Sequence, residues 1–371
     1  MTRTVEEKIA YFKSRRLTVL DKVYRIKIEA SLGCNRDCEF CGMTRKRSCL
    51  LKPELFEVIL SKIPNTVRRI EFILHGEPTL NPNLLDYVEA IRDKHPKVQI
   101  AICSNGFRFL NKMYNPDYFF SLYDKGVNLL QVDLYDIEDW ESFKKLVGEN
   151  KTGIKEKGIG VKNLYAQNTN VFFSYRGDKN KELVYVKEFE GLNSGLCKQR
   201  RFHTFGGNVP VELWSKYSDK YKDFSKFPLT GKGKTCTSIL KYISIGADGN
   251  IYFCCRDASH TLLVGNIKDL DLQELWVSED IQKLRILIKY ARRDLLAHCF
   301  LCSRFNYRDG LYPYWGKKYS LEECIQTVVK KTILLDDVLL DNLIKYQKVY
   351  SNKIPDHITK QIEDSKKEYN K

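Results

Sequence analysis

Residues 34–41 read Cys-Asn-Arg-Asp-Cys-Glu-Phe-Cys and set Cys34, Cys38 and Cys41 at C-x3-C-x2-C spacing. Three thiolates at this spacing can hold three corners of a four-iron cluster and leave the fourth iron without a protein ligand. Such an open iron is a chemical site, because a small molecule must complete its coordination. The triplet alone also fits a zinc site. We call these three residues the N-terminal cysteines.

Outward from this loop, apolar strand patterns alternate with amphipathic helix patterns. Alternating βα units predict a parallel sheet and an α/β fold, and residues 148–169 read as a loop or an irregular crossover. The expected strands are 24–30, 70–74, 98–102, 128–134, 170–175 and about 201–205, and the expected helices cover 5–16, a segment from Pro53, a segment after Asn83, 116–124 and 138–147.

Polar and glycine residues follow several of these strands. His75-Gly76-Glu77-Pro78 follows the second strand, Ser104-Asn105-Gly106 follows the third, and Asp133 lies near the end of the fourth. Gly76 and Gly106 allow backbone to approach a ligand closely, and Glu77 offers a carboxylate to a bound ammonium group. All of them fall at carboxyl ends of expected strands, where α/β barrels place their chemistry.

The cysteine loop and these motifs resemble those of the radical S-adenosylmethionine (radical SAM) enzymes, over roughly residues 20 to 210. His75 departs from the family pattern, which usually has glycine there. The resemblance implies a partial (β/α)6 TIM-like barrel and a [4Fe-4S] cluster on the N-terminal cysteines, with SAM bound at its open iron. The SAM-binding residues that it implies are Phe40, Gly76, Glu77, Pro78, Ser104, Asn105, Asp133 and Arg176.

A second group of cysteines, the auxiliary cysteines, comprises Cys236, Cys254, Cys299 and Cys302. Between them we expect a hairpin, 242–245 with 250–253, whose Asp-Gly turn is a strong hairpin signal, and a helix over 271–289. These elements would bring the four cysteines around one metal centre. Tetrahedral zinc would accept the same set, so the spacing does not decide between zinc and iron.

This segment is similar to the SPASM/twitch extension of radical SAM enzymes. The resemblance implies a second [4Fe-4S] cluster, ligated by all four auxiliary cysteines and suited to electron transfer. The longer SPASM pattern continues with further cysteines, whereas this chain has Arg308 near the next position, which favours the shorter twitch form. We therefore expect an N-terminal helix (1–19), a radical SAM partial barrel (20–225), a small α+β auxiliary cluster domain (226–310) and a helical C-terminal extension (311–371).

Further candidates lie near the expected pocket. Cys255 is either a hydrogen-atom donor to a substrate radical or a small buried thiol, and burial is the commoner state of a free cysteine. Cys49, Cys103, Cys197 and Cys324 are interpreted as core residues. The candidate substrate contacts are His203, Asn208, Arg256 and Asp257.

Composition limits the environment of the protein. The chain of 371 residues has a formal net charge of +15, which would favour anionic partners, but the basic residues form no long block and a nucleic-acid role is not favoured. The sequence has neither a long apolar segment nor a signal peptide, so we expect a cytoplasmic protein without a membrane partner. The tail after Cys302 either caps the cluster domain or docks a partner, and its end, 356–371, is expected to fray.

The resemblance implies a radical SAM enzyme that takes an electron from a flavodoxin- or ferredoxin-class reductant and abstracts hydrogen from a substrate C–H bond. The expected outcome is dehydrogenation or epimerisation of a small polar substrate such as a sugar or aminocyclitol. Modification of a peptide, as in ribosomal-peptide maturation, or of a nucleic acid is the alternative. A non-catalytic metal-binding module is the alternative of another class.

Overall fold

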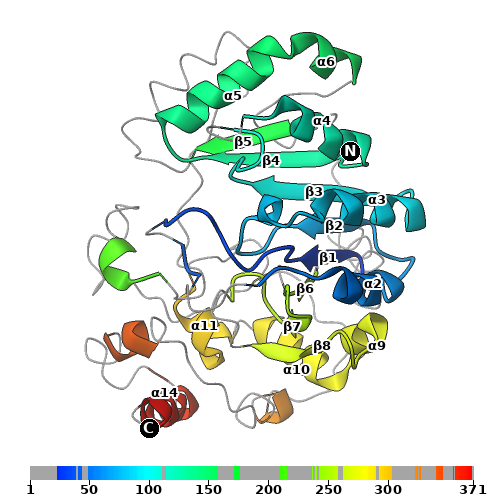
Figure 1. Ribbon diagram of the computed structural model, residues 1–371. Coiled ribbons are helices and arrows are strands. Elements are labelled where there is room, and N and C mark those ends of the chain that lie inside the picture. The colour runs from blue at the N-terminus through cyan, green and yellow to red at the C-terminus, as the bar shows by residue number, and fades with distance from the viewer. Residues whose placement is uncertain are drawn as a thin grey trace, which may run out of the picture.

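The computed structural model describes residues 23–38, 41–43, 49–110, 114–157, 171–175, 209–214, 236, 239, 242–257, 262–289, 292–302, 322–324, 326, 340–345, 354 and 356–369. Within them, one eight-stranded sheet runs in the order β5-β4-β3-β2-β1-β6-β7-β8. Figure 1 shows the strands following one another in this order from β5 to β8.

The first five strands pair in parallel and alternate with helices, which confirms the expected α/β partial barrel. Pro53 opens the first described helix, a position where a missing N–H does no harm. The elements are β1 (Arg25–Ile28), α2 (Pro53–Ser61), β2 (Arg69–Phe72), α3 (Leu84–Lys94), β3 (Gln99–Ser104), α4 (Pro116–Asp124), β4 (Leu129–Leu134), α5 (Ile137–Glu149), α6 (Lys151–Glu156) and β5 (Val171–Tyr175).

The hairpin of the auxiliary segment extends this sheet. β6 (Ile243–Ile245) pairs in parallel with β1, with Ile26 opposite Ile243. β7 (Asn250–Tyr252) and β8 (Leu263–Asn266) then follow in antiparallel pairs. Lys62, just after α2, also donates to the carbonyls of Ile267, Lys268 and Leu270 at 2.6–3.1 Å. The barrel and the auxiliary segment therefore share a continuous sheet.

Three expectations for secondary structure were wrong. The helix expected over 271–289 is divided into α9 (Leu272–Val277) and α10 (Glu279–Lys289), because Ser278 between them has an extended backbone, with ψ at 151°. Helix α6 lies within the segment expected to be a loop. The charged C-terminus forms α14 (Asp356–Tyr369) instead of fraying.

Helix α14 packs on the auxiliary segment, as Figure 1 shows beside α11 (Ala297–Phe300). His357 donates from Nε2 to the carbonyl of Leu295 at 2.6 Å. A buried apolar cluster joins α14 and residue 354 to α11, to residues 209–214 and to residues 340–345: Val209, Trp214, Ala297, Phe300, Leu301, Leu340, Leu343, Ile354, Ile358 and Ile362. Of the two roles expected for the tail, these contacts are those of a cap.

The helix expected over 5–16 and the strand expected near 201–205 lie outside the described residues. In the part of the chain that the structure describes, none of the helices has the length and apolar character needed to cross a membrane.

Candidate active site

A cavity of about 140 Å³ opens at the carboxyl ends of β1 to β4. Its walls come from the cysteine loop, from the segments that follow β2, β3 and β4, and from the turn after β7 in the auxiliary segment. Residues expected to bind SAM and the first cluster thus share one cavity with residues expected to touch substrate. Those lining it are Cys34, Cys38, Cys41, Gly76, Glu77, Ser104, Asn105, Asp133, Cys255 and Arg256.

The cysteine loop is held by contacts to two neighbouring strand ends. Asn105, after β3, donates from Nδ2 to the Cys34 thiol at 3.6 Å and to Oδ1 of Asn35 at 2.9 Å. The backbone N–H of Arg36 also donates to the Cys34 thiol at 3.4 Å. N–H groups directed at a sulfur stabilise its thiolate form, which is the form that binds metal. Burial raises the pKa of the Cys34 thiol, and the hydrogen bond from the Arg36 N–H opposes that shift. The two N–H groups fix the position of the sulfur.

Gly76 is the position where the turn after β2 meets the cysteine loop. A Cβ on Gly76 would lie 1.8 Å from the carbonyl oxygen of Ser31 and 2.6 Å from that of Gly33. The next residue, Glu77, donates from its backbone N–H to the same Gly33 carbonyl at 2.8 Å. Only glycine fits here, because the turn packs directly against the backbone that leads into Cys34.

Glu77 is a buried carboxylate that braces the pocket wall. Its Oε1 accepts from the backbone and hydroxyl of Thr79 and from the Ser104 hydroxyl, and its Oε2 accepts from the backbone N–H of Asn105 at 2.7 Å. Burial raises its pKa, although these hydrogen bonds oppose the shift. Pro78 begins the short 3-10 helix η1 (Pro78–Leu80), is buried, and lies behind the cavity wall.

Sequence reasoning missed several residues of this cavity. Cys103, interpreted as a core residue, lines it and donates to Oδ2 of Asp133 at 3.4 Å, while Gln131 donates to Oδ1 at 2.6 Å. Lys27, which also lines the cavity, forms an ion pair with Glu71 at 3.3 Å. The sequence did contain a signal for Lys27: apolar and polar residues alternate along β1, and Lys27 lies between the buried Ile26 and Ile28.

Arg36 was missed because its partners are distant in sequence. It forms an ion pair with Oδ2 of Asp136 at 3.1 Å and a second one with the fully buried Asp139. Its guanidinium also lies over the ring of Tyr135, 4.6 Å from the centroid. The cysteine loop is thereby clamped to the start of α5.

The auxiliary cysteines come together from three points of the chain. Cys236 precedes β6, Cys254 follows β7, and Cys299 and Cys302 flank the end of α11. Burial raises the pKa of the Cys299 thiol, and the charges of Cys302 and Cys236 raise it further. A hydrogen bond with Cys255 and burial raise the pKa of Cys254, and the charges of Cys236 and Cys299 raise it further. A group of thiols that oppose one another's ionisation is a site for a cation that neutralises them.

The donor sets fit iron–sulfur clusters. Within the described residues, no three His, Cys, Asp or Glu side chains converge as the ligands of one metal ion would. A four-iron cluster makes no such demand, since each cysteine binds a different iron. Three cysteines line the open cavity and four lie together in the auxiliary segment, as expected for one cluster with an open iron and one that is fully ligated.

Cys255 and its neighbours differ in how they meet the cavity. Cys255 is buried at the wall, with Sγ 2.9 Å from the Tyr242 hydroxyl, and Arg256 lines the same wall. Asp257 is fully buried, accepts from the backbone N–H of Leu262 at 2.6 Å, and is not among the described residues that line the cavity. Phe40, Arg176, His203, Asn208 and Cys197 lie outside the described residues.

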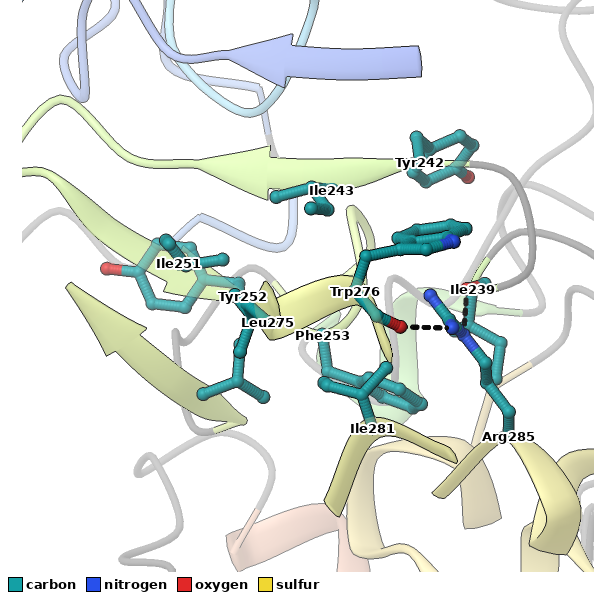
Figure 2. Close-up of a pocket in the computed structure, with 11 residues that line it drawn as sticks. Ile239, Tyr242, Ile243, Ile251, Tyr252, Phe253, Leu275, Trp276, Ile281 and Arg285 are labelled. Carbon is teal, nitrogen blue, oxygen red and sulfur yellow. Dashed lines mark hydrogen bonds between the residues drawn. The ribbon is translucent and has the colours of Figure 1, made fainter. Parts of the chain in front are cut away.

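A second, much smaller cavity lies within the auxiliary segment. Figure 2 shows it lined by apolar side chains of β6 and β7 and of α9 and α10, with Arg285 at one side. Arg285 lies over the Trp276 ring, 3.6 Å from the centroid, and donates to the Trp276 carbonyl at 2.7 Å. Its volume of about 20 Å³ has room for one water molecule. This cavity is a packing defect, and the larger one is the candidate active site.

Comparisons with known proteins match a family model to the segment around each cysteine group. Residues 28–156 match the model of the radical SAM superfamily, and residues 236–303 match that of the SPASM iron–sulfur cluster-binding domain. A curated relative, the S-adenosyl-L-methionine-dependent 2-deoxy-scyllo-inosamine dehydrogenase of Niallia circulans, is 22% identical over 302 residues, which are 80% of this chain and 99% of the relative. The GTP 3',8-cyclase of Sulfurovum sp. (strain NBC37-1) is 23% identical over 53% of this chain and 62% of its own length.

Solved structures support the fold. The crystal structure of BtrN in complex with AdoMet and 2-DOIA superposes with a TM-score of 0.54 at 19% identity, over 76% of this chain and 94% of that one. BtrN in an open conformation gives a TM-score of 0.50 at 16% identity, over 80% of this chain and all of the other.

Sheet, cavity and cysteine groups define an α/β partial-barrel enzyme that uses SAM and [4Fe-4S] clusters. The chain belongs to the radical SAM superfamily and carries a SPASM/twitch-like cluster-binding domain after its barrel. It is a radical SAM enzyme, as the sequence resemblance predicted.

Proposed function

We propose that this enzyme dehydrogenates a small polar substrate of the sugar or aminocyclitol kind. The observation that carries the proposal is the shared cavity, in which the N-terminal cysteines and Cys255 of the auxiliary segment line the same space. A substrate held there would lie beside the N-terminal cysteines and beside Cys255, which is adjacent in sequence to the auxiliary cysteine Cys254. The dehydrogenase of Niallia circulans, which matches over nearly its whole length, supports the choice of substrate class.

When bound, SAM and the clusters supply the radical chemistry: an electron from an external reductant cleaves SAM to methionine and a 5'-deoxyadenosyl radical, which removes one hydrogen atom from the substrate. In dehydrogenation the second hydrogen would leave the substrate as a proton, and a cluster on the auxiliary cysteines would supply an acceptor for the remaining electron. The N-terminal cysteines would hold the first cluster, and Cys236, Cys254, Cys299 and Cys302 the second.

The protein contributes binding, orientation and shielding. Glu77 would receive the methionyl ammonium of SAM on Oε2, which accepts one hydrogen bond from Asn105, while Oε1 holds the wall through Thr79 and Ser104. Asp133 would approach the SAM ribose. Lys27 and Arg256 on the cavity wall offer hydrogen-bond donors to hydroxyl or amino groups of a polar substrate.

Epimerisation is the second candidate, and the position of Cys255 favours it. Its thiol lies at the cavity wall beside the Tyr242 hydroxyl. A thiol so placed can give a hydrogen atom to a substrate radical, which leaves a Cys255 thiyl radical. One electron from the external reductant and one proton would then restore the thiol, and the net change in the substrate is inversion without oxidation. Peptide or nucleic-acid substrates are further outcomes that the same experiment would detect.

The test is an anaerobic reaction of reconstituted enzyme with SAM, dithionite and candidate aminocyclitols in deuterated water, followed by mass spectrometry. Loss of two hydrogens by the substrate supports dehydrogenation, whereas unchanged skeleton mass with one deuterium gained supports epimerisation. A Cys255→Ala variant separates them further, because it should still dehydrogenate but could not epimerise. Absence of 5'-deoxyadenosine in every reaction would contradict both.

A further inference from the structure

Arg293 is buried against the auxiliary cysteines. It begins the 3-10 helix η9 (Arg293–Leu295) and is 1% exposed. Its Nη2 donates to the carbonyls of Cys299 and Cys302 at 3.4 and 3.2 Å. Its charge acts on the thiols of Cys302, Cys299 and Cys236. One guanidinium therefore faces three of the four auxiliary cysteines.

The remaining nitrogens of this guanidinium have no acceptor among the residues that the structure describes. Among the described residues, neither Nε nor Nη1 of Arg293 has a hydrogen-bond partner, and both are buried. A buried N–H without an acceptor is costly, and more so on a charged group. Next to these three thiols, the natural acceptors are the sulfur atoms of the cluster that the thiols would hold.

The nearby acid does not neutralise Arg293. Asp294 is bound by Arg292, which donates from Nε to Oδ1 at 3.0 Å and from Nη2 to Oδ2 at 3.1 Å. Arg292 is part-exposed at the surface, in contrast to its neighbour. The positive charge of Arg293 is thus directed at the cysteines, and arginine keeps that charge at any pH of interest.

We propose that Arg293 sets the reduction potential of the auxiliary cluster. Reduction adds a negative charge to the cluster, and a buried cation beside it stabilises the reduced form, so the potential rises. A higher potential makes the cluster a better acceptor for the electron that a dehydrogenated substrate gives up. The inference rests on the proposed assignment of the four auxiliary cysteines as ligands.

The experiment is a redox titration of the full-length, reconstituted enzyme, followed by electron paramagnetic resonance. A background with Cys34, Cys38 and Cys41 replaced by alanine isolates the auxiliary signal. At the midpoint potential of the parent, Arg293→Met should raise the ratio of oxidised to reduced cluster at least tenfold, which for a one-electron couple equals about 59 mV. Arg293→Lys, which keeps the charge, should shift the ratio less.

Arg292→Gln is the matched control. It also removes one positive charge, but the charge of Arg292 is paired with Asp294. It should leave the midpoint unchanged. Equal shifts in Arg292→Gln and Arg293→Met, or an unshifted midpoint in fully loaded Arg293→Met, would overturn the proposal. If Arg293→Met fails to retain iron, Arg293→Gln is compared with Arg293→Lys by the same criterion.

Iron analysis distinguishes a failure of the ligand assignment from a failure of the role proposed for Arg293. Replacing Cys254 and Cys299 by alanine in the same background should abolish the remaining iron. If iron is retained, the ligand assignment has failed. If iron is lost but the Arg293 variants titrate like the parent, the assignment stands and the role of Arg293 has failed.

Discussion

The two cysteine groups lie in different surroundings. The N-terminal cysteines are half-buried, line a cavity of about 140 Å³ and follow a loop packed against Gly76. In the auxiliary group Cys254 and Cys299 are buried, Arg293 lies beside the thiols, and α14 covers the neighbouring apolar residues. The first group leaves room for a small molecule, whereas in the second Cys254 and Cys299 are buried and Cys236 and Cys302 are half-buried.

This difference separates chemistry from electron storage. A cluster that must bind SAM needs an open face and a backbone that lets ligands approach closely. A cluster that exchanges only electrons gains from burial and fixed charges, which control its potential. The shared cavity, with Cys255 at its wall, lies where the two environments meet.

The largest contrast should come from removing one ligand of each group. Cys34→Ala should abolish SAM cleavage while the auxiliary cluster persists, so iron content falls to about half. Cys299→Ala should also lose about half of the iron but keep SAM cleavage to 5'-deoxyadenosine, with product formation lost. Iron analysis and chromatography of both products measure this, and SAM cleavage by Cys34→Ala would contradict the division of labour.

A methyl group at Gly76 should damage only the open site. Gly76→Ala places a Cβ 1.8 Å from the Ser31 carbonyl, so the backbone must move, at a cost of more than about 4 kcal/mol in unfolding free energy or by loss of the first cluster. Gly148→Ala is the control, because its Cβ would have no neighbour within 4 Å. It should stabilise α5 by roughly 0.5–1 kcal/mol. Urea denaturation and iron content compare the two.

Arg36 tests whether the open loop depends on its clamp. Arg36→Ala leaves Asp139 buried without its cation, which should lower the unfolding free energy by about 3 kcal/mol. The first cluster should also bind less firmly, since the loop between its ligands is released. Arg36→Lys should recover part of both. Unchanged iron retention during chelator challenge of Arg36→Ala would show that the clamp does not hold the site.

The smallest expected effect concerns the cap on the closed site. Ile358→Ala opens a cavity in the cluster that joins α14 to α11 and should cost about 2 kcal/mol. Oxygen should then bleach the auxiliary cluster faster while the first cluster is unaffected. Glu363→Ala, on the exposed face of α14, should behave as wild type. Equal bleaching rates in the two variants would argue against a shielding role for α14.

Local patterns made the barrel predictable. β4 is buried along its whole length and α4 begins at a proline, so both were expected to within a residue. The cysteines and the Gly76 turn could be predicted because each motif is defined by residues that are close together in the sequence. The segment of helix α14 was expected to fray because it has many charged residues and only a narrow apolar stripe, which includes Ile358 and Ile362.

Contacts between residues far apart in the chain could not be predicted from the sequence. Arg36 and Asp139 are 103 positions apart, and nothing local marks either as the other's partner. β6 was expected in a separate domain, but its pairing with β1 is decided by how the whole sheet assembles. The burial of Arg293 depends likewise on where α11 and the auxiliary hairpin come together.

The most direct test of the account is whether SAM perturbs one cluster and spares the other. In reduced enzyme that lacks Cys254 and Cys299, addition of SAM should change the electron paramagnetic resonance spectrum, because SAM binds the open iron. In enzyme that lacks Cys34, Cys38 and Cys41, the spectrum should stay the same. A SAM-induced change in the second variant, or none in the first, would contradict the assignment of the open cluster.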